Sequence, residues 1–273
     1  MSLNNKIIGV FDSGFGGLTV FSAIAKKLPQ YNYIYLGDNA RSPYGDYDFE
    51  TVYKYTLECV EWLFAKGCLL VILACNTASA KALRTIQQND LPSKYPNNRV
   101  LGVIRPTAEV IFNYTLSKHV GILGTRGTIN SNSYKIEINK FSPNLQVYQQ
   151  SCPMWVPLIE KNEHLTPVAD VFVKKYVNDL LKKSNKIDCI LLACTHYPLL
   201  IQKIEKYLPK GIQLLSQGEI VANSLVDYLN RHPEIDEKLL KENKKIFYTS
   251  GNTQIFNNHA NQFFGEEIQS IKM

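Results

Sequence analysis

The sequence predicts an α/β fold of two similar domains with mainly parallel sheets, related by a pseudo-twofold axis. Short apolar runs alternate with stretches of helical spacing, as in parallel strands covered by helices on both faces. There are too many such runs for one comfortable sheet, and 273 residues are enough for two ordinary domains. Two segments also read alike, VILACNTASA at 71–80 and ILLACTHYPLL at 190–200.

Each predicted strand leads into a glycine-containing or polar turn, and most then lead into a helix. The longest predicted helix covers residues 48–66. This alternation is typical of βαβ units, which place consecutive strands in parallel. The predicted strands are 7–11, 31–37, 69–74, 100–104, 120–124, 145–150, 189–193, 212–216 and 245–250.

Polar stretches at 89–99 and 207–213 are the candidate crossings between domains. They predict a first domain of residues 1–99 plus 212–273, carrying Cys75, and a second of residues 100–211, carrying Cys194. The two cysteines are 194 − 75 = 119 residues apart, about one domain length. Internal duplication is one interpretation of this spacing, and chance similarity between strand-to-helix turns of shared composition is the alternative.

Composition excludes several classes of protein. Hydrophobic residues make up 45% and charged residues 20% of the chain, and no apolar run approaches the ~18 residues of a membrane span. The N-terminal MSLNNKIIGV lacks the apolar region of a secretory signal. The net charge of +6 comes from scattered lysines, so the densest cluster, KENKK at 241–245, predicts a solvated face and no nucleic-acid partner.

The six cysteines predict reduced thiols in a cytoplasmic protein. There is no CxxC pair, and the spacing of Cys189, Cys194 and His196 fits no common zinc pattern, so we expect no metal site. Cys59, Cys68 and Cys189 fall inside predicted helices or strands and are interpreted as small buried residues.

Cys75 and Cys194 differ because each follows a strand and precedes a helix. The helix dipole and free amides stabilise a thiolate there, and the motifs CNT (75–77) and CTH (194–196) supply groups that bind a carboxylate. Small buried residues remain the alternative. A pair of thiols can remove a proton from one face of a carbon and return one to the other. A hydrolase needs only one nucleophilic cysteine, so the pair favours a racemase or epimerase.

Three other turns lie where ligands bind in such sheets. In DSGFGG (12–17), Asp12 suits a substrate ammonium or assists a thiol, and no P-loop lysine is present. In RSPYG (41–45), backbone amides are available to a ligand, and in GTRGT (124–128) two hydroxyls stand near a helix start. Helix caps and ordinary surface turns are the alternatives.

Six motifs in this order resemble the cofactor-independent glutamate racemases of the aspartate/glutamate racemase superfamily: FDSGFGGLTV, LGDNARSPYG, LACNTASA, GTRGTINSNSY, CPMWVPLIE and LLACTHYPLL. The resemblance covers residues from about 7 to 230. It implies interconversion of L- and D-glutamate for peptidoglycan synthesis without pyridoxal phosphate, metal or other cofactor. It also implies an active site in the cleft between two domains, and a homodimer.

The resemblance assigns roles to individual residues. Cys75 matches the residue that deprotonates D-glutamate, assisted by Asp12, and Cys194 the residue that deprotonates L-glutamate, assisted by His196. Glu160 matches an acidic residue near the second cysteine. Further matches to substrate-binding positions, besides Asp12 and His196, are Ser13, Pro43, Tyr44, Gly45, Asn76, Thr77, Thr125, Thr128 and Thr195.

One residue departs from the family pattern. Gln217 stands where we expect an acidic or small residue, and we expect it to affect packing or interdomain contacts more than chemistry. Alternatives are an aspartate or hydantoin racemase with the same mechanism, a thiol hydrolase or amidase using Cys194, and a binding protein for an acidic ligand. For the racemase we expect the domains to hinge around the substrate, because desolvation strengthens its polar contacts. Residues beyond about 240 carry no usable motif.

Overall fold

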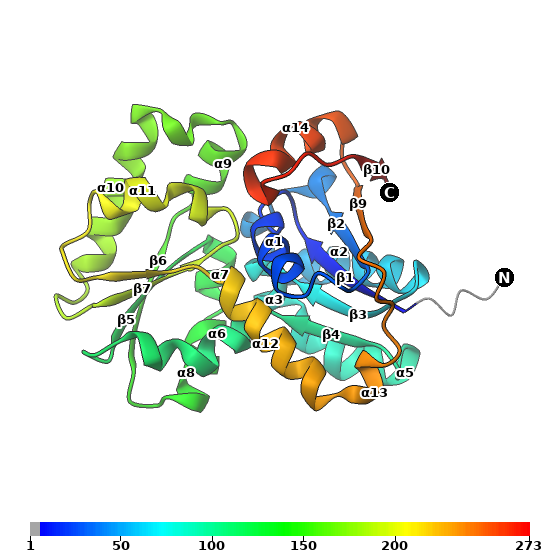
Figure 1. Cartoon of the computed structure of the whole chain (residues 1–273). Helices are drawn as coiled ribbons and strands as arrows, with labels where there is room; N and C mark the ends of the chain where they lie inside the picture. Colours follow the sequence, from blue (N-terminus) through cyan, green and yellow to red (C-terminus); the bar gives the residue numbers. More distant parts are fainter. Residues whose placement is uncertain (1–5) are drawn as a thin grey trace.

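The computed structural model describes residues 6–273 (Figure 1). We expect the N-terminal segment 1–10 to lack a secretory signal, and its first part, residues 1–5, lies outside the described residues. The chain forms two parallel β-sheets that lie side by side with helices around them, so the predicted fold class is confirmed.

The larger sheet has six strands in the order β10-β9-β2-β1-β3-β4, and all its pairs are parallel. Its centre, β1, is buried along almost its whole length, which explains why an unbroken apolar run encodes it. The strands are β1 (Ile7–Asp12), β2 (Tyr33–Gly37), β3 (Cys68–Leu73), β4 (Arg99–Gly102), β9 (Lys245–Thr249) and β10 (Ser270–Lys272).

The smaller sheet has four parallel strands in the order β6-β5-β7-β8. They are β5 (His119–Gly124), β6 (Gln146–Ser151), β7 (Cys189–Ala193) and β8 (Gln213–Leu215). Gly124 at the end of β5 is paired with Ser151 and with Ala193, so these three strands end together at one edge. The segment after β7 therefore starts from that edge.

The helices follow the strands in the predicted alternation. The helix expected at 48–66 is α2 (Phe49–Ala65), capped where Asp48 accepts from the backbone N–H of Thr51 at 2.7 Å. The others are α1 (Leu18–Lys27), α3 (Asn76–Lys81), α4 (Leu83–Thr85), α5 (Leu91–Lys94), α6 (Ile104–Val110), α7 (Arg126–Asn130), α8 (Ser133–Phe141), α9 (Trp155–Glu160), α10 (Pro167–Leu181), α11 (Ile201–Glu205), α12 (Gly218–Arg231), α13 (Pro233–Asp236) and α14 (Thr253–Phe264).

All nine predicted strands are present, eight of them with shifted ends and β7 with the predicted bounds, and β10 is an unpredicted tenth. Two of them join a different sheet from the one that the predicted boundaries imply, since β4 pairs with β3 and β8 pairs with β7. The chain thus leaves the six-stranded sheet after β4 and leaves the four-stranded sheet after β8. Which sheet a strand joins depends on distant partners, and polar composition carries no information about them. The division into two domains at 99/100 and 211/212 stays a prediction.

The two halves share a continuous apolar core. One buried cluster includes Val10 of β1, Phe21 of α1, Leu225 of α12 and Leu192 of β7. In Figure 1, α12 runs from the end of the four-stranded sheet across to the other half, where it packs along α1. The helix after β8 therefore joins the halves through its buried face.

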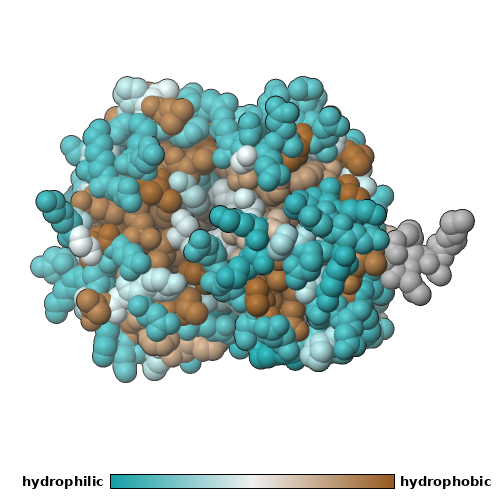
Figure 2. Space-filling view, viewed as in Figure 1, coloured by the Kyte–Doolittle hydropathy of each residue, from teal (hydrophilic) through white to brown (hydrophobic). Residues whose placement is uncertain are grey.

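Hydrophilic residues cover most of the face in Figure 2, and hydrophobic patches interrupt them, most broadly over the half with the four-stranded sheet. Across residues 6–273, every helix falls short of the length and apolar character that a membrane span requires.

Candidate active site

The chemically reactive side chains gather where strands of the two sheets end. Asp12 is the last residue of β1, Cys75 lies two residues after β3, and Cys194 directly follows β7. In parallel sheets these carboxyl ends form the edge at which ligands bind. Hydrogen bonds link the three turns to one another, so the two sheets contribute to one candidate site.

Cys75 occupies the N-cap position of α3. Its Sγ accepts from the backbone N–H of Ala78 at 3.4 Å and lies 3.3 Å from Oγ of Ser13. Burial raises the pKa of the Cys75 thiol to about 12, and the charge of Asp12 acts in the same direction. Cys75 is therefore a neutral thiol at neutral pH in this arrangement.

Asp12 is buried and connects the turns that follow β1 and β7. Its Oδ2 accepts from the backbone N–H of Gly14 at 2.9 Å, and its Oδ1 accepts from Oγ1 of Thr195 at 3.4 Å. Burial raises the pKa of Asp12, although the charge of His196 and two backbone N–H groups oppose the rise. A buried carboxyl group thus stands between the two cysteine turns.

Cys194, His196 and Glu160 form a connected set. Nδ1 of His196 lies 3.9 Å from Sγ of Cys194, and its Nε2 lies 3.1 Å from Oε1 of Glu160. Burial alone would lower the pKa of His196, but the hydrogen bonds to Cys194 and Glu160 outweigh it and raise this pKa to about 10. Burial opposes ionisation of Glu160 too, yet hydrogen bonds from His196 and Ser42 leave the Glu160 pKa lowered. The pair is therefore imidazolium and carboxylate at neutral pH.

A cluster of threonine hydroxyls joins the halves beside Cys75. Oγ1 of Thr77 lies 2.9 Å from Oγ1 of Thr125, which in turn bonds to Oγ1 of Thr128 at 3.1 Å. Gly45 packs against this cluster, because a Cβ added there would lie 3.0 Å from Cβ of Thr125. These hydroxyls are placed to exchange their mutual bonds for bonds to a carboxylate.

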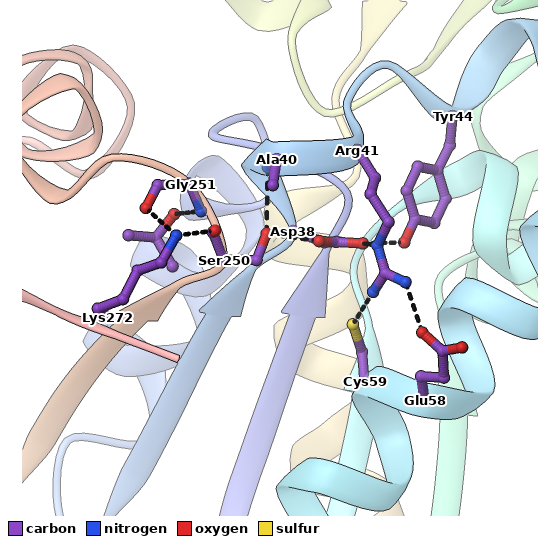
Figure 3. A network of polar contacts seen from close by, with 10 residues as sticks. Asp38, Ala40, Arg41, Tyr44, Glu58, Cys59, Ser250, Gly251 and Lys272 are labelled. Carbon is purple, nitrogen blue, oxygen red and sulfur yellow. Dashed lines mark hydrogen bonds and ion pairs between the residues drawn. The ribbon is translucent and has the colours of Figure 1, made fainter.

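A polar network around the buried Asp38 anchors the RSPYG turn (Figure 3). The phenol of Tyr44 donates to Asp38, whose carboxylate also accepts from Nε of Arg41 at 2.6 Å and from Oγ of Ser250 at 2.5 Å. Because the Tyr44 phenol is bound there, the backbone of Tyr44 and not its side chain is available to a ligand. Pro43 in the same turn is exposed.

The structure thus brings most predicted site residues into a few linked contacts. The direct hydrogen-bond links include Asp12, Ser13, Cys75, Thr77, Thr125, Thr128, Glu160, Cys194, Thr195 and His196. Asn76 belongs to a separate buried network with Gln217 and Tyr134. Across residues 6–273, no group of three or more His, Cys, Asp or Glu side chains is arranged to hold a metal ion.

Sequence reasoning missed several residues of this neighbourhood. Ser42 donates to Glu160 at 3.2 Å, and the ring of Phe263 in α14 lies 5.5 Å from that of His196. Phe15 of the glycine-rich turn packs on Phe256 and Phe263. Nothing in the sequence after residue 240 indicates that α14 covers the turn beside the site.

Comparison with known proteins identifies the class to which this fold and site belong. Residues 12–225 match the family described as Asp/Glu/Hydantoin racemase. The chain belongs to this family of isomerases.

Within the family, the chain is similar to glutamate racemases over nearly its full length. The glutamate racemase of Ruegeria sp. (strain TM1040) is 37% identical, with 96% of this chain and 97% of the relative covered. The crystal structure of the Bacillus anthracis isoform RacE1 has a TM-score of 0.89 at 33% identity, over 99% of this chain and 98% of that chain. The Francisella tularensis enzyme, solved in complex with D-glutamate, has a TM-score of 0.86 at 30% identity, over 99% and 97%.

Proposed function

We propose that this chain is a glutamate racemase that moves protons between the substrate Cα and two cysteine thiols, without a cofactor. The observation that carries the proposal is the placement of Cys75 and Cys194, which follow strands of different sheets. The turn after β1 contacts both cysteine turns, through the Ser13–Cys75 contact and the Thr195–Asp12 hydrogen bond. The similarity to glutamate racemases, one of them described in complex with D-glutamate, supports the choice of substrate.

In the L-to-D direction the Cys194 thiolate takes the Cα proton of L-glutamate. The electron pair left on Cα delocalises into the α-carboxylate, where hydrogen-bond donors stabilise the developing charge. The protonated His196 ring, 3.9 Å from the sulfur and paired with Glu160, places positive charge beside Cys194. This charge stabilises the thiolate before the transfer.

The Cys75 thiol then donates its proton to the opposite face of Cα and gives D-glutamate. The electron pair remains on the sulfur, where the Ser13 hydroxyl at 3.3 Å and the Ala78 N–H at 3.4 Å stabilise the thiolate. The D-to-L reaction runs these steps in reverse. Each cysteine is a base in one direction and an acid in the other.

The remaining groups suit the charged ends of an amino-acid dicarboxylate. Asp12 would accept from the substrate ammonium, while the threonine hydroxyls and the backbone N–H groups of Tyr44 and Gly45 would donate to the carboxylates. Both cysteines are only 6% exposed, so we propose that the halves separate to admit substrate and close around it. Structures with and without glutamate that share one interdomain angle would contradict this motion.

The resemblance further leads us to propose that the D-glutamate serves peptidoglycan synthesis in the cytoplasm and that the enzyme is a homodimer. Neither nucleic acid nor a membrane is part of the proposed function. Sedimentation equilibrium of the purified chain tests the dimer directly. Loss of viability on depletion in its own host, relieved by supplied D-glutamate, tests the metabolic role.

The test of the activity is proton NMR in D2O with L-glutamate, D-glutamate and L-aspartate, with optical rotation followed in parallel. We expect loss of the Cα–H signal from both glutamate enantiomers and decay of rotation without any added cofactor. Exchange with aspartate alone would keep the mechanism and change the substrate. No exchange with any of the three would overturn the racemase in favour of a Cys194 hydrolase or a binding protein.

A further inference from the structure

Three buried side chains next to Cys75 form a closed ring of hydrogen bonds. Tyr134 donates its hydroxyl to Oδ1 of Asn76 at 2.5 Å, and Nδ2 of Asn76 donates to Oε1 of Gln217 at 2.7 Å. Nε2 of Gln217 donates back to the Tyr134 hydroxyl at 2.7 Å. All three residues are at most 4% exposed, so water does not compete for these bonds. We call this arrangement the amide ring.

A carbonyl group outside the amide ring fixes its direction. Nε2 of Gln217 also lies 3.1 Å from the backbone oxygen of Val103, which can only accept. The amide nitrogen of Gln217 must therefore face Val103, and its oxygen must face Asn76. Asn76 then has to present its own nitrogen to Gln217 and its oxygen to Tyr134. Each orientation follows from the one before it.

The amide ring connects three segments that are far apart in the sequence. Asn76 is the first residue of α3 and directly follows Cys75, Tyr134 lies in α8, and Gln217 is the N-cap of α12. One proton of the Asn76 amide is used by Gln217, so the second has a fixed direction. The start of α3 is thereby tied to the half that carries Cys194.

We propose that Gln217 is a positioning residue for proton transfer at Cys75, acting through Asn76 on the N-terminus of α3. This inference rests on the proposed function and concerns one of its two proton-transfer steps. It also gives a role to the residue that departs from the family pattern in sequence. Gln217 is suited to this role because it donates to Val103 and Tyr134 and accepts from Asn76 at the same time.

A neighbouring cavity makes the position sensitive to side-chain loss. A cavity of about 750 Å³ between α1, α6 and α12 is lined by Gln217, Cys194 and Thr195 among others. Shortening residue 217 would open the amide ring toward this cavity. Isosteric substitutions are therefore the cleaner tests.

The informative variants are Gln217→Glu, Gln217→Met and Tyr134→Phe. Glu replaces the donor facing Val103 with an oxygen, Met removes all polar atoms at similar length, and Phe deletes one hydroxyl. Thr107→Val is the matched control, because Oγ1 of Thr107 also contacts Nε2 of Gln217 at 2.9 Å but lies outside the amide ring. Tyr134→Phe, the mildest change, keeps the test available if a residue-217 variant does not fold.

The measurement is the primary deuterium isotope effect on kcat/KM, taken separately with D- and L-[2-²H]glutamate. L- and D-glutamate have the same free energy in solution, so any variant must lower kcat/KM by the same factor in both directions. The rates alone therefore cannot show which proton-transfer step is affected. We expect kcat/KM to fall about tenfold to a hundredfold, as for a misplaced reacting group. The isotope effect should rise for the D substrate, whose proton goes to Cys75, and should not rise for the L substrate.

Thr107→Val should leave both isotope effects at the wild-type values. The positioning role would be overturned by wild-type kinetics in Gln217→Glu, or by slower kinetics with both isotope effects unchanged. Either result would leave the proposed racemase activity intact. A wild-type protein that racemises no glutamate in the same assay would overturn the proposed function and this inference together.

Discussion

Gly16 packs directly against His196. A methyl group added at Gly16 would lie 2.4 Å from Nδ1 of His196 and 2.5 Å from Oγ1 of Thr195, closer than non-bonded atoms approach. The turn after β1 therefore meets the turn after β7 only because residue 16 has no side chain. This close approach accompanies the contact between Asp12 and Thr195.

We expect Gly16→Ala to displace His196 from between Cys194 and Glu160. Overpacking of this kind costs about 1–3 kcal/mol of stability, and racemisation should fall about a hundredfold because the group that stabilises the Cys194 thiolate is misplaced. Urea denaturation and optical rotation measure the two effects. Gly211→Ala is the control, since Gly211 has a φ of +92° and no neighbour within 4 Å. It should cost stability through backbone strain but leave the rate unchanged, whereas a fully active Gly16→Ala would refute the argument.

The His196–Glu160 pair should stabilise the fold over a defined pH range. The pKa of His196 is raised from 6.5 to about 10, so its contribution is full below about pH 6.5 and is lost as the pH rises through 10. The lowered pKa of Glu160 makes its contribution present above about pH 4.5 and lost on acidification.

We therefore expect His196→Asn to lower the free energy of unfolding more at pH 6 than at pH 10.5. Comparing the variant with wild type at each pH cancels the titration of unrelated lysines and tyrosines. Chemical denaturation at four or five pH values measures the difference. A destabilisation independent of pH between 6 and 10.5 would mean that His196 is not held protonated by its neighbours.

Tyr44→Phe should weaken substrate binding more than chemistry. The change leaves the buried Asp38 carboxylate without the Tyr44 donor, which costs about 1–3 kcal/mol. The turn that presents backbone groups at 43–45 would then be less well anchored, so KM for glutamate should rise more than kcat falls. Tyr47→Phe, at a more exposed tyrosine three residues further along the chain, is the matched control. Equal kinetics in the two variants would contradict this role of Tyr44.

Much of the fold could be predicted because its signals are local. β3 and β7 are buried along their whole length, so both appear in the sequence as unbroken apolar runs. The positions of Cys75 and Cys194 at the ends of these runs follow from the same local pattern. The sheet to which β4 or β8 belongs could not be predicted, since it depends on pairing with a strand that is distant in sequence.

The contacts within the candidate site depend even more on distant pairing. Glu160 reaches His196 across 36 residues of sequence, and only the family resemblance drew attention to it. The sequence predicts that Gln217 affects packing or interdomain contacts, but it does not identify Asn76, 141 residues away, as its hydrogen-bond partner. Both polar side-chain atoms of Asn76 are hydrogen-bonded within the protein because α3, α8 and α12 meet there. No local sequence pattern encodes this meeting of helices.

The two-thiol mechanism makes its sharpest prediction for Cys75→Ser and Cys194→Ser. Each should slow racemisation about a hundredfold to ten-thousandfold, the usual worth of a general acid or base, because a serine hydroxyl is a far weaker acid than a thiol. Cys189→Ala, in the buried core of β7, is the control and should lose stability while keeping activity. A substrate analogue with a leaving group at Cβ separates the half-reactions, since elimination needs only the base. Cys75→Ser should still eliminate from the L series through Cys194, and Cys194→Ser from the D series through Cys75. Normal racemisation by either serine variant would exclude the two-thiol mechanism, and elimination with the opposite enantiomeric preference would exchange the roles of the two cysteines.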